Sequence, residues 1–185
     1  MRVVAGKYRG KNLVTPKDDS VRPTTTRIKE TLFNVLQGWV SGASVLDLFA
    51  GCGSLGIECI SRGAKDVTFV DRSKDSVSFV YQNLKGIDGE YRVVNADFAS
   101  VLRTSYVSGK KYDLIFLDPP YATMLGELAI DLIVELDLLS DDGIIVFEHG
   151  SEKTYRMKAA GFKQRTKKMG TITAEFISRK SVALM

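Results

Sequence analysis

Between residues 44 and 147 the sequence alternates short apolar runs with segments of helical periodicity. The apolar runs at 44–49, 112–117 and 143–147 are nearly unbroken, which is typical of central strands covered on both faces. Further strands are predicted at 67–70 and 91–95, and helices at 55–62, 75–84, 99–107 and 125–139. Strands that alternate with helices form β-α-β units. The sequence therefore predicts an α/β fold with a doubly wound, mostly parallel sheet.

The two ends of the chain depart from this pattern. Segments 162–167 and 171–178 flank a Lys-Met-Gly turn and predict an antiparallel C-terminal hairpin, which brings the sheet to seven strands. At the other end, residues 2–15 predict a small β-hairpin around Gly6–Gly10, and 25–40 predict a helix. A length of 185 residues suits one domain. We expect a basic N-terminal hairpin and linker over 1–24, followed by one domain over 25–185.

A glycine-rich loop follows the strand at 44–49. Gly51, Gly53 and Gly56 match G-x-G-x-x-G between a strand and a helix, where glycines let the backbone approach a ligand closely. Asp71 lies 20 residues beyond Gly51, at the end of the next strand, where a carboxylate accepts the hydroxyls of a ribose. The loop and Asp71 together predict a site for a nucleotide-like cofactor.

Two further acidic positions favour S-adenosylmethionine over a dinucleotide. Asp47 stands four residues before Gly51, where a carboxylate suits a cationic amino acid better than a pyrophosphate. Asp97, followed by Phe98, offers a carboxylate and a ring to an adenine. Each residue has a structural alternative: Asp47 could hold a buried turn, and Asp97 could cap a helix. Their shared place at strand ends favours the ligand site.

The segment Asp118-Pro119-Pro120-Tyr121 follows the most apolar strand. Two prolines withhold N–H donors, so this corner offers acceptors beside an aromatic ring. A planar exocyclic amine matches it, since hydrogen bonds to Asp118 and to the Pro119 carbonyl would aim the nitrogen lone pair at a methyl donor. Asp118 would then take the released proton. The structural alternative is a rigid turn with an exposed tyrosine.

Charge is distributed unevenly along the chain. Residues 1–38 hold eight basic and three acidic side chains, 39–151 hold nine and seventeen, and 152–185 hold nine and two, for a total of +4. Basic ends around an acidic middle point to a polyanionic partner. A single histidine makes a histidine metal cluster or a Ser/His/Asp triad improbable. We expect no metal site.

Composition and segment lengths bear on where the protein works. Two cysteines are too few for a disulfide framework, which favours a reducing cytoplasm. No apolar run approaches the ~18 residues of a membrane span, and the first residues lack the apolar stretch of a secretory signal. We expect a cytoplasmic monomer with no membrane association.

Larger segments resemble a known family. The stretch VLDLFAGCGSLGIE over 45–58, with DPPY over 118–121, resembles class I S-adenosylmethionine-dependent methyltransferases that act on exocyclic amines. The segments RVVAGKYRGK over 2–11, Arg22-Pro23-Thr24 and 27–34 narrow this to the RsmD family of bacterial 16S ribosomal RNA guanine-N2 methyltransferases. One departure is Cys52, where many such loops carry Ser or Thr.

The resemblance implies a function and a set of site residues. The function is methyl transfer from S-adenosylmethionine to the N2 of a guanine of 16S rRNA, of the guanine-966 type, on the small ribosomal subunit. The implied cofactor residues are Arg22, Thr24, Asp47, Phe49, Ala50, Gly51, Gly53, Gly56, Asp71, Arg72, Asp97 and Phe98. Asp118, Pro119, Pro120 and Tyr121 would bind the flipped-out guanine, and Arg2, Lys7, Arg9 and Lys11 would contact RNA.

Three other functions are compatible with parts of the pattern. An adenine-N6 or cytosine-N4 DNA methyltransferase shares the DPPY corner, although the chain has little room for a target-recognition domain. A dinucleotide-dependent oxidoreductase shares the glycine loop. A non-catalytic RNA-binding assembly factor would keep the fold and the basic ends.

Overall fold

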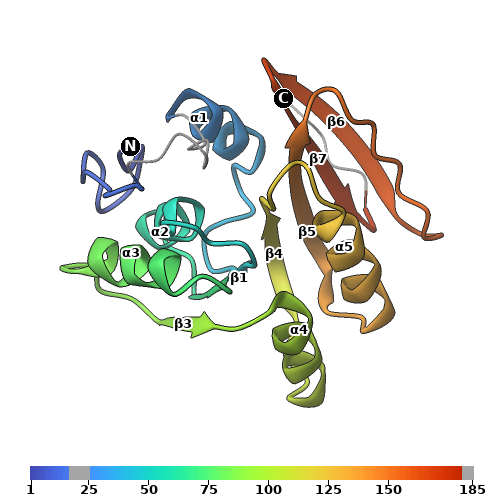
Figure 1. The fold of residues 1–185 in the computed structure, drawn as a ribbon, viewed down its shortest axis with the longest axis horizontal. Coiled ribbons are helices and arrows are strands. Elements are labelled where there is room, and N and C mark those ends of the chain that lie inside the picture. The colour runs from blue at the N-terminus through green and yellow to red at the C-terminus, as the bar shows by residue number, and fades with distance from the viewer. Residues whose placement is uncertain (17–25, 181–185) are drawn as a thin grey trace.

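The computed structural model describes residues 1–16 and 26–180 and shows a single seven-stranded sheet with helices on both faces (Figure 1). The strands are β1 (Ser44–Asp47), β2 (Asp66–Asp71), β3 (Tyr91–Asn95), β4 (Tyr112–Leu117), β5 (Leu139–Gly150), β6 (Lys163–Met169) and β7 (Ile172–Ser178). The helices are α1 (Thr26–Val35), α2 (Ser54–Ser61), α3 (Lys74–Leu84), α4 (Phe98–Val107) and α5 (Leu125–Glu135).

The strand order is β3-β2-β1-β4-β5-β7-β6. All neighbouring pairs from β3 to β5 are parallel, whereas β7 runs antiparallel to both β5 and β6. The order reverses between β1 and β4, so this is where a doubly wound sheet opens a crevice at its strand ends. The predicted fold, with its antiparallel C-terminal hairpin, is confirmed.

Two apolar cores lie on opposite faces of the sheet. Helices α1, α2 and α3 contribute Phe33, Ile57 and Val80 to one core, and α4 and α5 contribute Leu102 and Ile133 to the other. Alternate strand residues point to opposite faces, so β1 is buried along its whole length between the two layers, and β4 is buried at every residue except Asp113. This explains why their sequences read as unbroken apolar runs.

Some element boundaries differ from the predicted ones. Helix α1 ends at Val35 rather than at residue 40, and its predicted start at 25 lies outside the described residues. Helix α5 ends at Glu135, and Asp137 then adopts a left-handed conformation with φ 50° as the chain turns into β5. Strand β5 is longer than predicted because it pairs with both β4 and β7.

The N-terminal segment is a compact loop held on α2. Its two arms meet at one antiparallel bridge, Arg2 to Asn12, so the predicted hairpin is present only as this bridge and not as paired strands. The backbone N–H groups of Val4 and Ala5 donate to the Glu58 carboxylate at 2.8 and 3.0 Å. The predicted boundary near residue 24 falls outside the described residues.

Candidate active site

A cavity of about 680 Å³ opens at the carboxyl ends of the parallel strands. Twelve of the predicted site residues line it: Asp47, Phe49, Ala50, Gly51, Asp71, Arg72, Asp97, Phe98, Asp118, Pro119, Pro120 and Tyr121. They come from segments up to 74 positions apart, and the parallel sheet brings them together because its carboxyl ends share one edge. Most of the predicted cofactor residues and the predicted amine corner therefore share one cavity.

The glycine loop is held from beneath by Asp47. Its Oδ2 atom accepts a hydrogen bond from the Gly56 N–H at 3.0 Å, and the side chain is 2% exposed. Burial raises the pKa of Asp47 to about 7; the Gly56 N–H opposes this, and the nearby Asp118 and Asp71 carboxylates add to it. Asp47 therefore holds the turn, as the structural alternative proposed, and it also lines the cavity.

Glycine is required at two points of this loop. Gly53 has a φ of 81°, in the left-handed region that favours glycine, as the chain enters α2. At Gly56 a Cβ atom would lie 2.2 Å from Cε1 of Phe69, so only glycine lets α2 pack this closely on β2. Neither glycine lines the cavity itself. Both act by shaping the loop in front of it.

Asp71 joins the loop to the end of β2. Its Oδ2 accepts from the Gly51 N–H at 2.9 Å, and its Oδ1 accepts from the Ser73 N–H at 2.8 Å. The Asn95 amide donates to the carbonyls of Asp71 and Arg72, at 2.9 and 3.0 Å. These bonds fix the carboxylate at the cavity wall, and each oxygen keeps a second lone pair for a ligand.

Two aromatic side chains form part of the cavity wall. The rings of Phe49 and Phe98 lie 5.7 Å apart at 43°, and both line the cavity. Asp97 caps α4, since its Oδ1 accepts from the Ala99 N–H at 2.9 Å. One oxygen of Asp97 therefore caps the helix, as the structural alternative proposed, and the residue also lines the cavity.

The Asp118–Tyr121 corner closes the cavity on the side of α5. Pro119 is buried, Pro120 is exposed, and the Pro120 carbonyl accepts from the N–H and hydroxyl of Thr123, at 3.1 and 2.7 Å. Lys153 donates to the Thr123 carbonyl at 3.1 Å, which ties the turn to the segment after β5. The corner is therefore a braced turn with Asp118 at the edge of the cavity.

The remaining predicted residues lie elsewhere. Arg22 and Thr24 fall outside the described residues. Arg2, Lys7, Arg9 and Lys11 belong to the N-terminal loop on α2, and none of them lines the cavity. Lys7 pairs with Asp88 at 3.1 Å, and Lys11 donates to the Lys85 carbonyl at 2.7 Å. Their predicted role in RNA contact stays a prediction.

The cavity also has lining residues that we did not predict: Met1, Leu48, Cys52, Ser54, Leu55, Ser73, Ser76, Ala96, Ala122 and Leu125. Most of them adjoin a motif residue, and this proximity in sequence could have identified them. Ser76 lies in the first turn of α3, where its backbone N–H donates to the hydroxyl of Ser73, the cap of the helix, at 3.3 Å. Met1 and Leu125 carried no sequence signal, since only tertiary packing brings the N-terminal loop and the start of α5 to this place.

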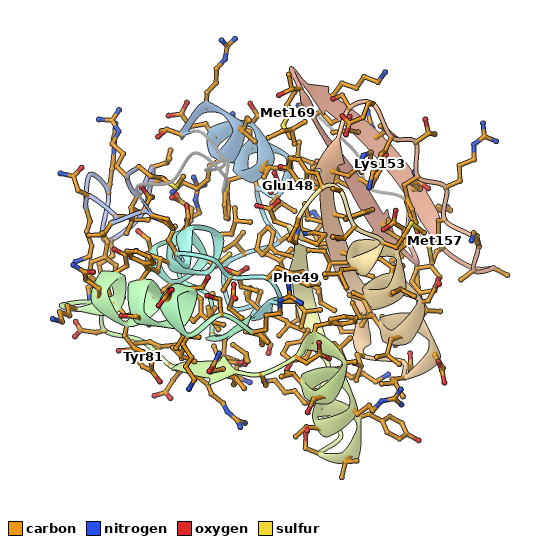
Figure 2. The ribbon with its side chains drawn as sticks, in the orientation of Figure 1. Phe49, Tyr81, Glu148, Lys153, Met157 and Met169 are labelled. Carbon is orange, nitrogen blue, oxygen red and sulfur yellow. The ribbon has the colours of Figure 1, made fainter. Side chains whose placement is uncertain are left out.

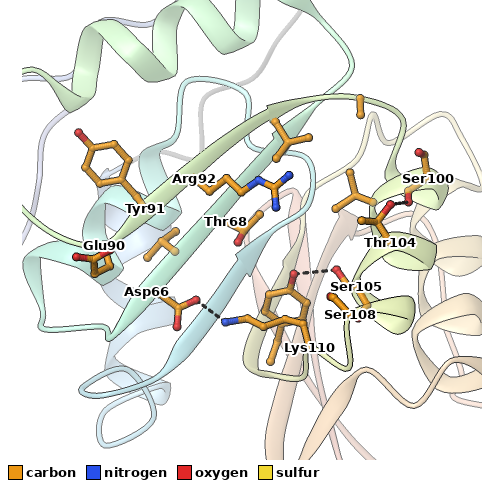
Figure 3. A pocket seen from close by; sticks show the side chains of 15 residues that line it. Asp66, Thr68, Glu90, Tyr91, Arg92, Ser100, Thr104, Ser105, Ser108 and Lys110 are labelled. Carbon is orange, nitrogen blue, oxygen red and sulfur yellow. Dashed lines mark hydrogen bonds and ion pairs between the residues drawn. The ribbon is translucent and has the colours of Figure 1, made fainter.

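A second hollow, of about 460 Å³, lies between β2, β3 and α4 (Figure 3). Its polar groups are largely paired with each other: Lys110 with Asp66 at 2.8 Å, Ser105 with Tyr112 at 3.0 Å, and Thr104 with the Ser100 carbonyl at 2.9 Å. It contains none of the predicted catalytic or cofactor residues. The larger cavity is therefore the candidate active site.

The described residues include neither a membrane-spanning helix nor a group of metal-binding side chains. Within residues 1–16 and 26–180, no helix is long and apolar enough to cross a membrane. In the same part of the chain, no three or more His, Cys, Asp or Glu side chains are grouped as a metal ion would require.

Known proteins resemble this chain over nearly its whole length. The family model described as "conserved hypothetical protein 95" matches residues 1–178. Ribosomal RNA small subunit methyltransferase D of Haemophilus influenzae is 36% identical over 156 residues, which are 83% of this chain and 80% of that protein. The Escherichia coli protein of the same name is 36% identical over 149 residues, 80% of this chain and 74% of that protein.

The structural comparison agrees. The solved structure of yhhF from Escherichia coli superposes with a TM-score of 0.85 at 31% identity, and the match covers 98% of both chains. A methyltransferase complexed with S-adenosylhomocysteine shares the fold with a TM-score of 0.67 at 16% identity. The chain belongs to the RsmD family of S-adenosylmethionine-dependent methyltransferases, whose relatives are named for the RNA of the small ribosomal subunit.

Proposed function

We propose that this protein transfers a methyl group from S-adenosylmethionine to the exocyclic N2 of a guanine in 16S rRNA. One observation carries the proposal: the Asp118–Tyr121 corner and the carboxylates Asp47, Asp71 and Asp97 line the same cavity. A group held by the three carboxylates and an amine held at the corner would therefore be neighbours. Proximity and orientation are the main requirement of a one-step transfer.

The cavity residues fit S-adenosylmethionine. Asp47 presents a buried carboxyl at the loop, which suits the ammonium of the methionine part. Asp71 would accept the ribose hydroxyls, and Asp97 with the Phe49 and Phe98 rings would hold the adenine. When bound, the cofactor supplies an electrophilic methyl group on a positively charged sulfur. Arg72, Ala50 and the loop glycines would complete the binding surface.

The amine corner determines the class of substrate. Asp118 and the Pro119 carbonyl are acceptors, and Tyr121 offers a ring on which a flipped-out base can stack. Hydrogen bonds from an exocyclic amine to these two acceptors would orient the nitrogen lone pair toward the cofactor end of the cavity. Asp118 would take the proton that the amine releases as the new N–C bond forms.

The relatives support ribosomal RNA as the substrate. Those of Haemophilus influenzae and Escherichia coli are named as acting on the small subunit's ribosomal RNA. We propose guanine 966 as the position, the assembled small subunit as the partner, and the N-terminal loop with Arg2, Lys7, Arg9 and Lys11 as an RNA contact. We further propose that the protein works as a cytoplasmic monomer, that it needs no metal, and that residues 1–24 form a unit distinct from the catalytic domain.

Nucleoside mass spectrometry tests the function. Small subunits from cells without the gene are incubated with the protein and isotopically labelled S-adenosylmethionine, and N2-methylguanosine is expected at one position. Asp118→Ala should lower the rate by about 10²–10⁴-fold while S-adenosylhomocysteine still binds. Asp141→Asn, an exposed change at the start of β5, is the control and should leave the rate unchanged. Labelling of DNA alone would favour the DNA methyltransferase alternative instead.

A further inference from the structure

Glu148 is a carboxylic side chain in the interior of the protein, 1% exposed. In the β4–β5 register Leu117, the last residue of β4, pairs with Phe147, so Asp118 and Glu148 are the residues that directly follow this pair. Ile144 and Val146 belong to the core beneath α1 and α2, and the alternation along β5 places Glu148 on that side. Figure 2 labels Glu148 in the interior, near α1.

Both carboxyl oxygens of Glu148 are buried and have no hydrogen-bond partner among the described residues. Glu175, on the neighbouring strand β7, shows the usual arrangement: its carboxylate bonds to His149, Gln164 and Thr166, at 3.2, 2.8 and 2.6 Å. A buried polar group without a partner destabilises the fold and calls for a functional explanation.

The charged groups that act on Glu148 are residues of the candidate active site. Burial, together with the nearby carboxylates of Asp118 and Asp47, raises the pKa of Glu148 well above its usual range. The protonated form that this favours has one acceptor oxygen and one O–H donor. Glu148 and Asp118 follow paired positions of neighbouring strands, and Asp118 is the residue that would hold the target amine.

Guanine differs from the other amino bases in the atom beside its amine. Next to the N2 amine lies N1–H, a donor, followed by the acceptor O6. In adenine and cytosine the ring nitrogen beside the amine is an acceptor. Enzymes that act on flipped-out bases read this Watson–Crick edge by hydrogen bonds. An acceptor beside Asp118 is thus matched to guanine.

We propose that Glu148 is the specificity residue of the target-base site, and that its carboxyl accepts the N1–H of the guanine whose N2 amine Asp118 holds. The O–H of the acid would then donate to O6. This inference rests on the proposed function and adds the group that selects the base. Glu148 does not line the cavity of the free protein. The Asp118–Tyr121 segment therefore has to move as the base enters, so that the base can reach the Glu148 carboxyl.

The test pairs a protein change with a base change. Small subunits are reconstituted with 16S rRNA that carries either guanine or 2-aminopurine at the target position. 2-Aminopurine keeps the amine at C2 but has an unprotonated N1 and no oxygen at C6. The proteins compared are the wild type, Glu148→Leu, which removes the acceptor, and Glu148→Gln, which keeps an amide oxygen and an N–H. Glu175→Gln, a change of a buried carboxyl on the opposite face of the sheet, is the control.

The wild type, Glu148→Gln and Glu175→Gln should prefer guanine over 2-aminopurine by about tenfold or more in kcat/KM, since an unmatched buried polar group costs about that factor. Glu148→Leu should lose about tenfold on guanine, and its preference should fall to within about threefold of unity. Its affinity for S-adenosylhomocysteine and its melting temperature should be no lower than those of the wild type.

Two results would overturn the role of Glu148. One is an unchanged preference in Glu148→Leu, because a merely structural defect would slow both substrates equally. The other is a wild type that methylates the two bases equally well. Failure of the proposed function itself would give a different result: the wild type would then methylate the C2 amine of neither target base.

Discussion

The Asp47 carboxyl lies 3.0 Å from the Gly56 backbone N–H and joins the end of β1 to the first turn of α2. The bond holds the glycine loop against the sheet, and Asp47 remains part of the cavity wall. A residue that fixes the loop thus also offers its carboxyl to a ligand. Each partner of this hydrogen bond can be tested by a separate measurement.

Cofactor affinity should rise with pH through the neutral range. Because burial raises the pKa of Asp47 to about 7, the carboxyl is partly protonated at neutral pH, whereas a cationic ligand prefers it ionised. The affinity for S-adenosylhomocysteine should increase about tenfold from about pH 6 to about pH 8 and then level off. Isothermal titration calorimetry measures this. Methylthioadenosine, which lacks the ammonium, should show no such rise, and an identical pH dependence for both ligands would rule out this role of Asp47.

Gly56→Ala should destabilise the protein by about 1–3 kcal/mol, because the added methyl group would overlap the Phe69 ring. Chemical denaturation measures the loss. The companion change Phe69→Leu makes room, so the double variant should lose less than the sum of the two single losses. Strict additivity would show that the close approach of α2 to β2 is not the reason for glycine at this position.

The N-terminal loop should depend on a buried ion pair. Lys29 and Glu58 lie 3.2 Å apart with both side chains fully buried, and Lys29 also donates to the Arg2 carbonyl at 2.7 Å. Lys29→Met leaves Glu58 with only the partly exposed Arg62 as a counter-charge, at 2.9 Å, which costs about 3 kcal/mol. A fall in melting temperature of roughly 10 °C is expected. Lys7→Met, which breaks the exposed Lys7–Asp88 pair, is the control and should leave the melting temperature nearly unchanged; equal effects would contradict the prediction.

His149 should stabilise the C-terminal hairpin in a pH-dependent way. Burial lowers its pKa, but the contacts with the Glu175 carboxylate at 3.2 Å and the Gly150 carbonyl at 2.9 Å outweigh it, so the pKa of His149 is raised above 6.5. This contribution is complete below the unfolded pKa and is lost as the pH rises through the folded one. The pKa of Glu175 is lowered, although burial alone would raise it, so its contribution is lost only in acid, as the pH falls through its folded value.

The measurement is the free energy of unfolding of the wild type and of His149→Gln across this range. The difference between them should be largest between about pH 4.5 and pH 6.5 and should shrink toward about pH 9. A difference that stays constant from pH 5 to pH 9 would mean that the pKa of His149 is the same in the folded and the unfolded protein, which would contradict the prediction.

RNA binding should weaken steeply with salt, in part through the N-terminal loop. Changing Lys7, Arg9 and Lys11 together to Gln should lower the slope of log affinity against log salt concentration by about 0.7–0.9 for each phosphate that these side chains neutralise in the wild type. Lys111→Gln, at the opposite end of β4 from the active site, should keep the wild-type slope. If the triple variant keeps that slope too, the loop does not contact RNA.

The sequence by itself determined the class of fold and most of the site. Unbroken apolar runs indicate buried parallel strands because both faces of such a sheet are covered, and acidic residues at the ends of those runs must meet at one edge. Asp47, Asp71, Asp97 and Asp118 were predictable for this reason, and so was the antiparallel hairpin at the end of the chain. These signals are local in the sequence, and they suffice because the carboxyl ends of parallel strands lie at the same edge of the sheet.

Tertiary structure alone decided the parts that depend on contacts between distant segments. Strand β5 extends beyond its apolar run because β7 pairs with it, and the N-terminal loop owes its shape to Glu58 of α2. In sequence Glu148 is an ordinary acid at the end of a strand. Its burial, with no hydrogen-bond partner within residues 1–16 and 26–180, arises only when β4, β5 and α1 pack together. A sequence pattern reports what one element prefers, whereas burial and charge are properties of all the elements that surround a group.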